Sequence, residues 1–381
     1  MTVRITKPEF NLREKISELD KPSGLKGNEL LRSETTQEAR DLIRAGRKNM
    51  VINGSFLIDQ RNSGAELSIT GNTLFSADRW THNNDTFTHY KTQRKNDADI
   101  ATIGTEYYLR ATITATDSVG NNQSHQIENN LEGYTVKHLN LGTQGAKQCT
   151  LSFWVRCSIP GFFGGSLQNS AYNRCHPFSY TVDTADTWEH KTFTFNTRGF
   201  TTGSFNTANG VGLRLAFSLG NGNSRQGSPD KWHTSVVGFA PTGETRLVET
   251  NGATLDIAQV QLEVGKVATE FEHRSYHDEL LLCQRYYEGI IMGTGTALMR
   301  TYTNTAGSPT NVSNVEYNFK VEKRATPTWS LEGNATWYPS GASGMTAYPS
   351  TSTCLFQRND TAHQFFSDGA GDLCGSFSAE L

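Results

Sequence analysis

Apolar and polar residues alternate in short stretches along the chain from about residue 50 onward. Alternation with a period of two is typical of β-strands that bury one face. It predicts strands at 49–56 (ending in a tight turn), 107–114, 149–155, 178–182, 190–195, 212–219 and 255–262. Stretches rich in glycine or asparagine are predicted to separate the strands, at 120–122, 161–165 and 220–223. Because no helical periodicity intervenes, we expect a mainly β protein with a large jelly-roll β-sandwich over 49–274.

A helical spacing of apolar residues follows the predicted sandwich. Ser275, with Asp278 three positions later, predicts the start of a helix, and Gly289 predicts its end. The helix over 275–289 has a wide apolar face, so we expect it to link two domains and to pack between them or at a subunit contact. The alternation then resumes, most clearly at 314–321, which predicts a smaller C-terminal β-domain over 290–381.

Residues 1–48 show a different pattern. Thr35 and Glu38 form a capping pair ahead of apolar residues at helical spacing, and Gly46 suits a helix end, so a short helix is expected over 36–45. The residues before this helix contain too little apolar material to fold alone. Two interpretations remain open: an assembly segment that gains order against partner chains, or an unstructured leader.

Composition and charge narrow the functional classes. The chain of 381 residues has 20 Phe and 13 Tyr, which is too aromatic for a disordered protein. Its net charge is −3, and it has no basic stretch interleaved with aromatics of the kind that would predict nucleic-acid binding. No segment reaches the roughly 18 apolar residues of a membrane span, and the first residues lack the apolar region of a secretory signal. We therefore expect synthesis in a cytoplasm and no membrane insertion.

The cysteines form no CxxC pair and no zinc-ligand spacing. In a reducing compartment they are expected to be free thiols that act as small core residues. The six are Cys149, Cys157, Cys175, Cys283, Cys354 and Cys374.

Motifs of the common enzyme classes are absent from the sequence: it has no GxSxG, P-loop or HExxH. His273 and His277 are four residues apart, but the helix cap expected at Ser275 falls between them, so they predict no metal pair. The acids are scattered and nominate no catalytic pair. We therefore predict a non-enzymatic protein with no catalytic, cofactor or metal site, and a hydrolase is the less favoured alternative.

Aromatic side chains in turn-rich stretches are the candidate ligand contacts, because flat rings can stack on the apolar faces of sugars. Burial in a core or in a subunit contact is the alternative for each of them. The candidate glycan-contact residues are Trp232, Phe162, Phe163, Trp337 and Tyr338.

Several short segments resemble a recurrent module of phage tail-fibre proteins. They are RKNMVINGSF at 47–56, QR at 60–61, SADRW at 76–80, LDIAQVQLEVG at 255–265, ATEFEHR at 268–274 and LCQRYY at 282–287, with a weaker match in RATPT at 324–328. Their order and spacing match the module over 47–288. A further stretch, GNELLRSET at 27–35, is similar to the leaders of marine cyanophage structural proteins.

The resemblance implies a virion component made in the host cytoplasm. It implies a homotrimeric tail-fibre subunit that attaches to a glycan or an envelope protein of the host surface. Residues 1–48 would then bind other tail proteins, and 290–381 would form a receptor-binding tip. An architectural capsid-decoration, head-fibre or baseplate-connector protein is the alternative, and a polysaccharide depolymerase is less favoured.

The module is similar in turn to carbohydrate-binding jelly rolls of the galactose-binding type, which often hold a structural calcium. In this chain the corresponding positions lie near Leu57 on the opening side and at Ala258 and Gln259 on the closing strand. These side chains lack the charged oxygens that calcium prefers, so no calcium is expected there.

Overall fold

A computed structural model describes residues 48–381 except 73, 86–88, 117, 198–200, 293–296, 301–312, 332–335, 339–345, 359–363 and 367–371. Contacts between residues group Asn49–Leu381 into one compact unit. The helix predicted over 36–45 lies outside the described residues.

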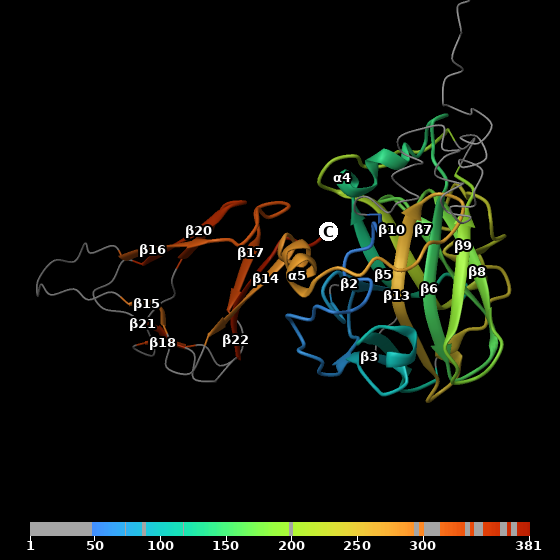
Figure 1. Ribbon diagram of the computed structural model, residues 1–381, viewed down its shortest axis with the longest axis horizontal. Coiled ribbons are helices and arrows are strands. Elements are labelled where there is room, and N and C mark those ends of the chain that lie inside the picture. Colours follow the sequence, from blue (N-terminus) through green and yellow to red (C-terminus); the bar gives the residue numbers. More distant parts are fainter. Residues whose placement is uncertain are drawn as a thin grey trace, which may run out of the picture. The chain divides into compact units, whose positions relative to one another are not determined.

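Two antiparallel sheets form a β-sandwich (Figure 1). In spatial order, the first sheet contains β1 (Leu67–Ser68), β3 (Tyr90–Lys95), β4 (Tyr108–Ile113), β13 (Thr254–Val264), β6 (Cys149–Cys157) and β9 (Glu189–Phe195). The second contains β2 (Trp80–Asn84), β5 (Ser124–Glu132), β10 (Val211–Asn221), β7 (Gly161–Gln168) and β8 (Cys175–Val182). The chain passes repeatedly from one sheet to the other, as in a jelly roll. The mainly β fold predicted from the alternation is therefore confirmed.

The connections between these strands contain short elements. They are η1 (Ile100–Ile103), α4 (Gly133–Val136), η2 (Lys137–Leu139), η3 (Asn223–Arg225), η4 (Leu247–Glu249) and the parallel pair β11 (Gln226–Gly227) and β12 (Ala240–Pro241).

The apolar faces of the two sheets meet in one core. Phe153 of β6 lies in the first sheet, and its ring centroid is 6.2 Å from that of Phe178 and 5.0 Å from that of Phe217, both in the second sheet. Trp80 is fully buried, with its ring 4.8 Å from the ring of Phe56. These tilted and edge-on contacts are the arrangements that aromatic pairs prefer. Aromatic burial between the sheets is thus a main source of stability.

The cysteines fit the expectation of free thiols in the core. Five of them, Cys149, Cys157, Cys175, Cys283 and Cys354, are free and buried. The side chain of Cys374 lies outside the described residues.

One predicted strand and one predicted separator were wrong. Residues 49–56 form a turn rather than a strand, because Asn53 takes a φ of 59° and its amide group donates to the carbonyl oxygens of Ile58 and Asp78. The expected separator at 161–165 is instead the first part of β7. Gly165 lets β10 approach closely, since a Cβ there would lie 1.9 Å from the carbonyl oxygen of Ala216.

Helix α5 (Tyr276–Gln284) begins as predicted, because the Ser275 hydroxyl accepts a hydrogen bond from the Asp278 N–H at 3.1 Å. Its end differs from the prediction. Gly289 does not stop the helix but lies inside β14 (Tyr287–Met292), where it pairs with Ser376. The helix ends at Gln284, and the chain enters β14 at Tyr287, which pairs with Ser378.

Three small antiparallel sheets make up the C-terminal region. The first contains β14, β22 (Asp372–Ser378) and β17 (Thr328–Leu331). The second contains β15 (Ala297–Arg300), β21 (Gln364–Phe366) and β18 (Thr336–Tyr338). The third contains β16 (Ser313–Asn318), β20 (Thr353–Arg358) and β19 (Thr346–Pro349). Strand β16 confirms the strand predicted at 314–321 for its first part, and the strand ends at Asn318. A small core forms from Ile290, Cys354, Phe356 and Phe377, with Tyr317, Phe319, Trp329 and Ala347 packed against it.

Candidate functional site

The segments that resemble the tail-fibre module contact one another in a largely buried polar cluster, here called the joint. Its members come from the opening segments, from the closing segments and from the chain end. They are Asn49, Asn53, Gln60, Arg61, Asp78 and Arg79; Glu272, Arg274, Glu279, Tyr286 and Tyr287; and Glu380.

Two asparagines of the opening segment tie it to the closing strand and to α5. The Asn49 amide donates to the Val260 carbonyl at 3.0 Å, and its oxygen accepts from the Leu262 N–H at 3.1 Å. The Asn53 N–H donates to the Glu279 carboxylate on α5. These bonds satisfy backbone groups that a turn leaves without a strand partner, so the asparagines are needed for closing the sandwich.

Two arginines tie the opening segments to the C-terminal sheet. Arg61 donates to Glu380 at 2.9 Å, and its guanidinium lies 3.6 Å from the ring centroid of Tyr287. Arg79 also donates to Glu380 and stacks 3.6 Å from the ring centroid of Tyr286. Arginine suits this position because its planar group can stack on a ring and bind a carboxylate at the same time.

A second ion-paired contact lies beside the joint. Glu132, at the end of β5, accepts hydrogen bonds from Arg285 at 2.7 and 2.9 Å and from the Tyr286 hydroxyl at 2.6 Å. Arg324, in the weaker matching segment, donates through Nε to the Ala379 carbonyl at 2.8 Å. The matching segments thus act as structural elements that fix the sandwich to the strands after it.

Asp78 is fully buried within the joint. Burial raises the pKa of its carboxyl to about 6, although Arg61 and the hydrogen bonds from Gln60 act in the opposite direction. The Gln60 N–H donates to it at 3.1 Å. This acid is held by internal donors, which suits a structural role.

The candidate glycan-contact aromatics are not brought together into one site. Phe163 belongs to the sandwich core and is 1% exposed, so its ring has no free face for a sugar and this candidate was wrong. Phe162 is half-buried, and its backbone pairs with Thr245. Trp232 is half-buried between the rings of His176 and Phe205, with centroids at 5.2 and 5.7 Å. Trp337 and Tyr338 lie in β18, and their side chains fall outside the described residues.

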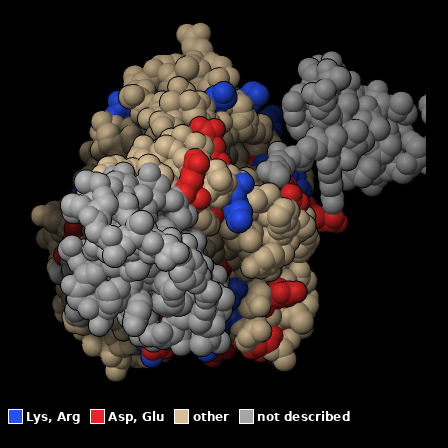
Figure 2. Space-filling view, turned by 90° about the vertical axis from the view of Figure 1, so that its left-hand side faces the viewer, with Lys and Arg blue, Asp and Glu red and all other residues tan. Residues whose placement is uncertain are grey.

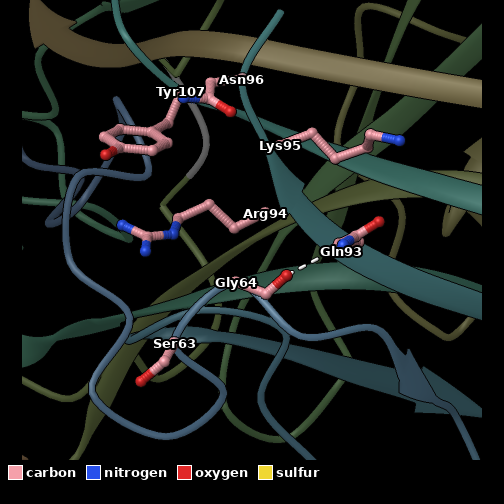
Figure 3. Close-up of a pocket in the computed structure, with 7 residues that line it drawn as sticks. All are labelled: Ser63, Gly64, Gln93, Arg94, Lys95, Asn96 and Tyr107. Atoms are coloured by element: carbon pink, nitrogen blue, oxygen red, sulfur yellow. Dashed lines mark hydrogen bonds between the residues drawn. The ribbon is translucent and has the colours of Figure 1, made fainter.

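A hollow of about 280 Å³ lies at the edge of the first sheet, where β3 extends beyond its short partner β1 (Figure 3). It is lined by Ser63, Gly64, Gln93, Arg94, Lys95, Asn96 and Tyr107. The Arg94 guanidinium donates to the Leu57 carbonyl at 2.9 Å and lies 4.3 Å from the ring centroid of Tyr107. The side chains of Gln93 and Lys95 point away from Arg94 and Tyr107 (Figure 3). The hollow is therefore lined mainly by polar groups, and Arg94 covers one face of its Tyr107 ring, which suits a small polar group better than a stacked sugar ring.

A larger hollow, of about 520 Å³, lies where β10 ends. Its lining residues are Asn223, Gln226, Gly243, Glu244, Thr245, Arg246, Glu249 and Thr250. Burial raises the pKa of Glu244 to about 7, and this carboxyl accepts from the Asn221 N–H at 2.6 Å. Arg246 is bound by the Asn221 carbonyl at 3.0 Å and by Asn223 at 2.6 Å. The charged groups of this hollow stabilise the end of β10, and no sequence pattern indicated them.

The outer face of the second sheet carries a buried polar row. Gln126 and Ser166 both donate to the Phe239 carbonyl, at 2.8 and 3.0 Å, so the connection before β12 covers this face. Glu128 lies in the same row and accepts from Asn83 at 3.1 Å, with Arg214 at 3.8 Å. Burial raises the pKa of the Glu128 carboxyl to about 7.

Replacing Glu128 by glutamine is expected to stabilise the protein at alkaline pH. The pKa of this group is higher in the folded state than in the unfolded state. The protonated carboxyl therefore stabilises the folded protein below pH 4.5, and this stabilisation is lost as pH rises through about 7. Glu128→Gln removes that loss and should raise the free energy of unfolding by about 2 kcal/mol at pH 8, with little change at pH 4. Urea unfolding at both pH values measures the difference. Glu106→Gln at an exposed acid is the control, and an equal response of the two variants would contradict the burial argument.

The side chains at the positions that correspond to a calcium site make other contacts. Ala258 is fully buried beside Ile100 and Tyr108. Gln259 lies in a β-bulge at a φ of 47° and donates to the carbonyl oxygens of Ile103 and Gly104 at 2.9 and 3.2 Å. Among the described residues, no group of three His, Cys, Asp or Glu side chains is placed to hold a metal ion.

Charge on the face shown in Figure 2 is of mixed sign, with Lys and Arg interspersed among Asp and Glu on a mostly neutral surface. Of the helices described, none has both the length and the apolar character needed to cross a membrane.

Comparison with known proteins finds similarity among solved structures. No family model and no curated protein matches the chain. An enzymatically active domain of bacteriophage CBA120 tailspike protein 4 aligns with 57% of this chain and 21% of its own, at 10% identity and a TM-score of 0.32. This chain therefore spans about a fifth of that protein.

Carbohydrate-binding modules also align. TmCBM61, solved in complex with β-1,4-galactotriose, matches 57% of this chain and 100% of its own, at 11% identity and a TM-score of 0.28. A CBM4 structure matches 49% of this chain and 95% of its own, at 12% identity and a TM-score of 0.26. At such TM-scores the assignment of the β-sandwich rests on the strand order of this chain itself.

Proposed function

We propose that the chain is a non-catalytic structural component of a phage virion, a tail-fibre subunit that attaches the particle to the host cell surface. The observation that supports this most is the joint. The segments that resemble the tail-fibre module are far apart in sequence, and they contact one another in one cluster that fixes the sandwich to the following strands. This is the arrangement expected of a module that passes the chain on to a further domain.

The proposal assigns a role to each part of the chain. Residues 1–48 bind other tail proteins, the sandwich over 49–274 forms the body of the subunit, and 290–381 form the receptor-binding tip. Three copies assemble into a fibre, since closed cyclic symmetry is usual for oligomers. The buried acids Asp78, Glu128 and Glu244 are held by internal donors, which supports a binding role rather than hydrolysis.

Binding to host cells tests the proposal. Fluorescently labelled full-length protein is expected to bind cells of a susceptible marine cyanobacterial strain in a saturable way and to reduce infection when added before the phage. A strain resistant to the phage is the control. The protein is also expected to release no reducing ends from extracted envelope polysaccharide.

Two other outcomes of this experiment would support a different function. Absence of both cell binding and inhibition would contradict attachment and favour an architectural role in the particle. Release of reducing ends would instead identify a depolymerase.

A further inference from the structure

The sheet formed by β16, β20 and β19 has one face used by the small C-terminal core. Cys354 and Phe356 of β20 are fully buried in that core, and Tyr317 and Ala347 from the neighbouring strands pack against it. Because side chains alternate along a strand, the residues between them point to the opposite face.

On that opposite face, three residues form a row across the sheet. Glu316 of β16 pairs with Leu355 of β20, which pairs on its other side with Tyr348 of β19. Side chains opposite one another in such pairs stand about 5 Å apart. Tyr348 is 53% exposed and Leu355 36%, and Glu316 is exposed as well. The row therefore presents a ring, an apolar side chain and a carboxylate to solvent, side by side.

The Tyr348 side chain extends from this face into solvent. Among the described residues its ring contacts no other ring and its hydroxyl makes no hydrogen bond. Residues two positions along on the same face are short and polar: Thr346 and Ser350 beside Tyr348, Thr353 beside Leu355, and Asn318 beside Glu316. The ring is thus left accessible on a flat surface rich in hydroxyl and amide groups.

From this arrangement we infer that the face of Tyr348, Leu355 and Glu316 binds a neutral saccharide. The apolar side of a pyranose ring stacks on Tyr348 and extends over Leu355, which removes apolar surface of both partners from water. The Glu316 carboxylate accepts hydrogen bonds from sugar hydroxyls, and bonds to a charged acceptor are stronger than neutral ones. The inference rests on the proposed function and names the ligand class of its receptor-binding tip.

The chemistry of the face argues against two other occupants. An acidic saccharide would place its negative charge near Glu316, which is unfavourable. A second copy of this chain would need an interface of about 800 Å² on each partner with an apolar centre. Here one tyrosine and one leucine are surrounded by Thr, Ser and Asn, so the surface fits a polar ligand with one apolar side.

A printed array of neutral, amino and acidic saccharides, incubated with labelled full-length protein, tests the inference. The wild type is expected to bind neutral saccharides. Tyr348→Ala should weaken that binding by about tenfold or more, whereas Tyr348→Phe keeps the ring and should remain within about twofold. Glu316→Gln should weaken it by about threefold, because the charge on the acceptor is lost. Tyr276→Ala, at a tyrosine of α5 that is 60% exposed, is the matched control and should bind as the wild type does.

The outcomes separate this inference from the proposed function. Binding by Tyr348→Ala within about twofold of wild type, a preference for acidic saccharides, or a wild type that binds cells but no saccharide would each overturn the inference and leave attachment standing. A wild type that binds neither cells nor saccharides would overturn both. Circular dichroism of every variant shows that a loss of binding is not a loss of fold.

Discussion

Arg79→Ala is expected to lower the free energy of unfolding by about 3–5 kcal/mol, because it removes one partner of a buried ion pair. Arg79 is 1% exposed, donates to Glu380 and to the Asn130 carbonyl, and stacks on Tyr286. The variant leaves the carbonyl without its donor and opens space beside the tyrosine ring. Urea unfolding, followed by tryptophan fluorescence, measures the change.

The same substitution should also loosen the connection between the sandwich and the strands after α5. Limited proteolysis of Arg79→Ala is expected to cleave near 275–290 faster than it cleaves the wild type. Lys231→Ala, at an exposed lysine, is the control and should change neither measurement. An Arg79→Ala protein as stable and as resistant as the wild type would show that the joint contributes nothing to the fold.

Gly54→Ala is expected to lower the free energy of unfolding by about 3–4 kcal/mol, since an added methyl group would force two backbone segments apart. A Cβ at this position would lie 2.1 Å from the carbonyl oxygen of Val260. The Val260 N–H donates to the Gly54 carbonyl at 2.8 Å, so the same displacement weakens a hydrogen bond. Thermal unfolding monitored by circular dichroism measures the effect.

Gly71→Ala is the matched control for Gly54→Ala. No atom lies within 4 Å of a Cβ built on Gly71, so this variant should unfold like the wild type. Equal stability of the two alanine variants would contradict the close approach of the opening turn to β13. It would also remove the physical reason for a glycine in the segment that resembles the tail-fibre module.

The strands that could be predicted from sequence are those that alternate cleanly. Strands β4, β6, β8, β9, β10 and β13 lie where the alternation placed them. Strand β5 was missed because its sequence, SHQIENNLE, is mostly polar although every residue is buried. Some of its polar side chains bind partners far away in sequence, as when Gln126 donates to the Phe239 carbonyl and Glu132 binds Arg285. No local pattern reveals such partners.

The resemblance to the tail-fibre module indicated the segments that form the joint, whereas the residue patterns did not predict that they meet. The asparagines at 49 and 53 looked like strand residues, and their hydrogen bonds to β13 and α5 depend on contacts across more than 200 residues. The aromatic candidates were chosen for their neighbours in sequence, which do not determine exposure. Phe163 proved to be buried, whereas the exposed Tyr348 sits in a stretch that gave no alternation strong enough to orient it.

The position of the chain in intact phage particles decides whether it is a tail-fibre subunit. Cryo-electron microscopy, with gold-labelled antibodies against residues 49–381 as a second readout, gives both its position and its copy number. We expect density on the tail fibres, in groups of three copies about a fibre axis. Density confined to the capsid surface, or the absence of the chain from the particle, would contradict the tail-fibre assignment.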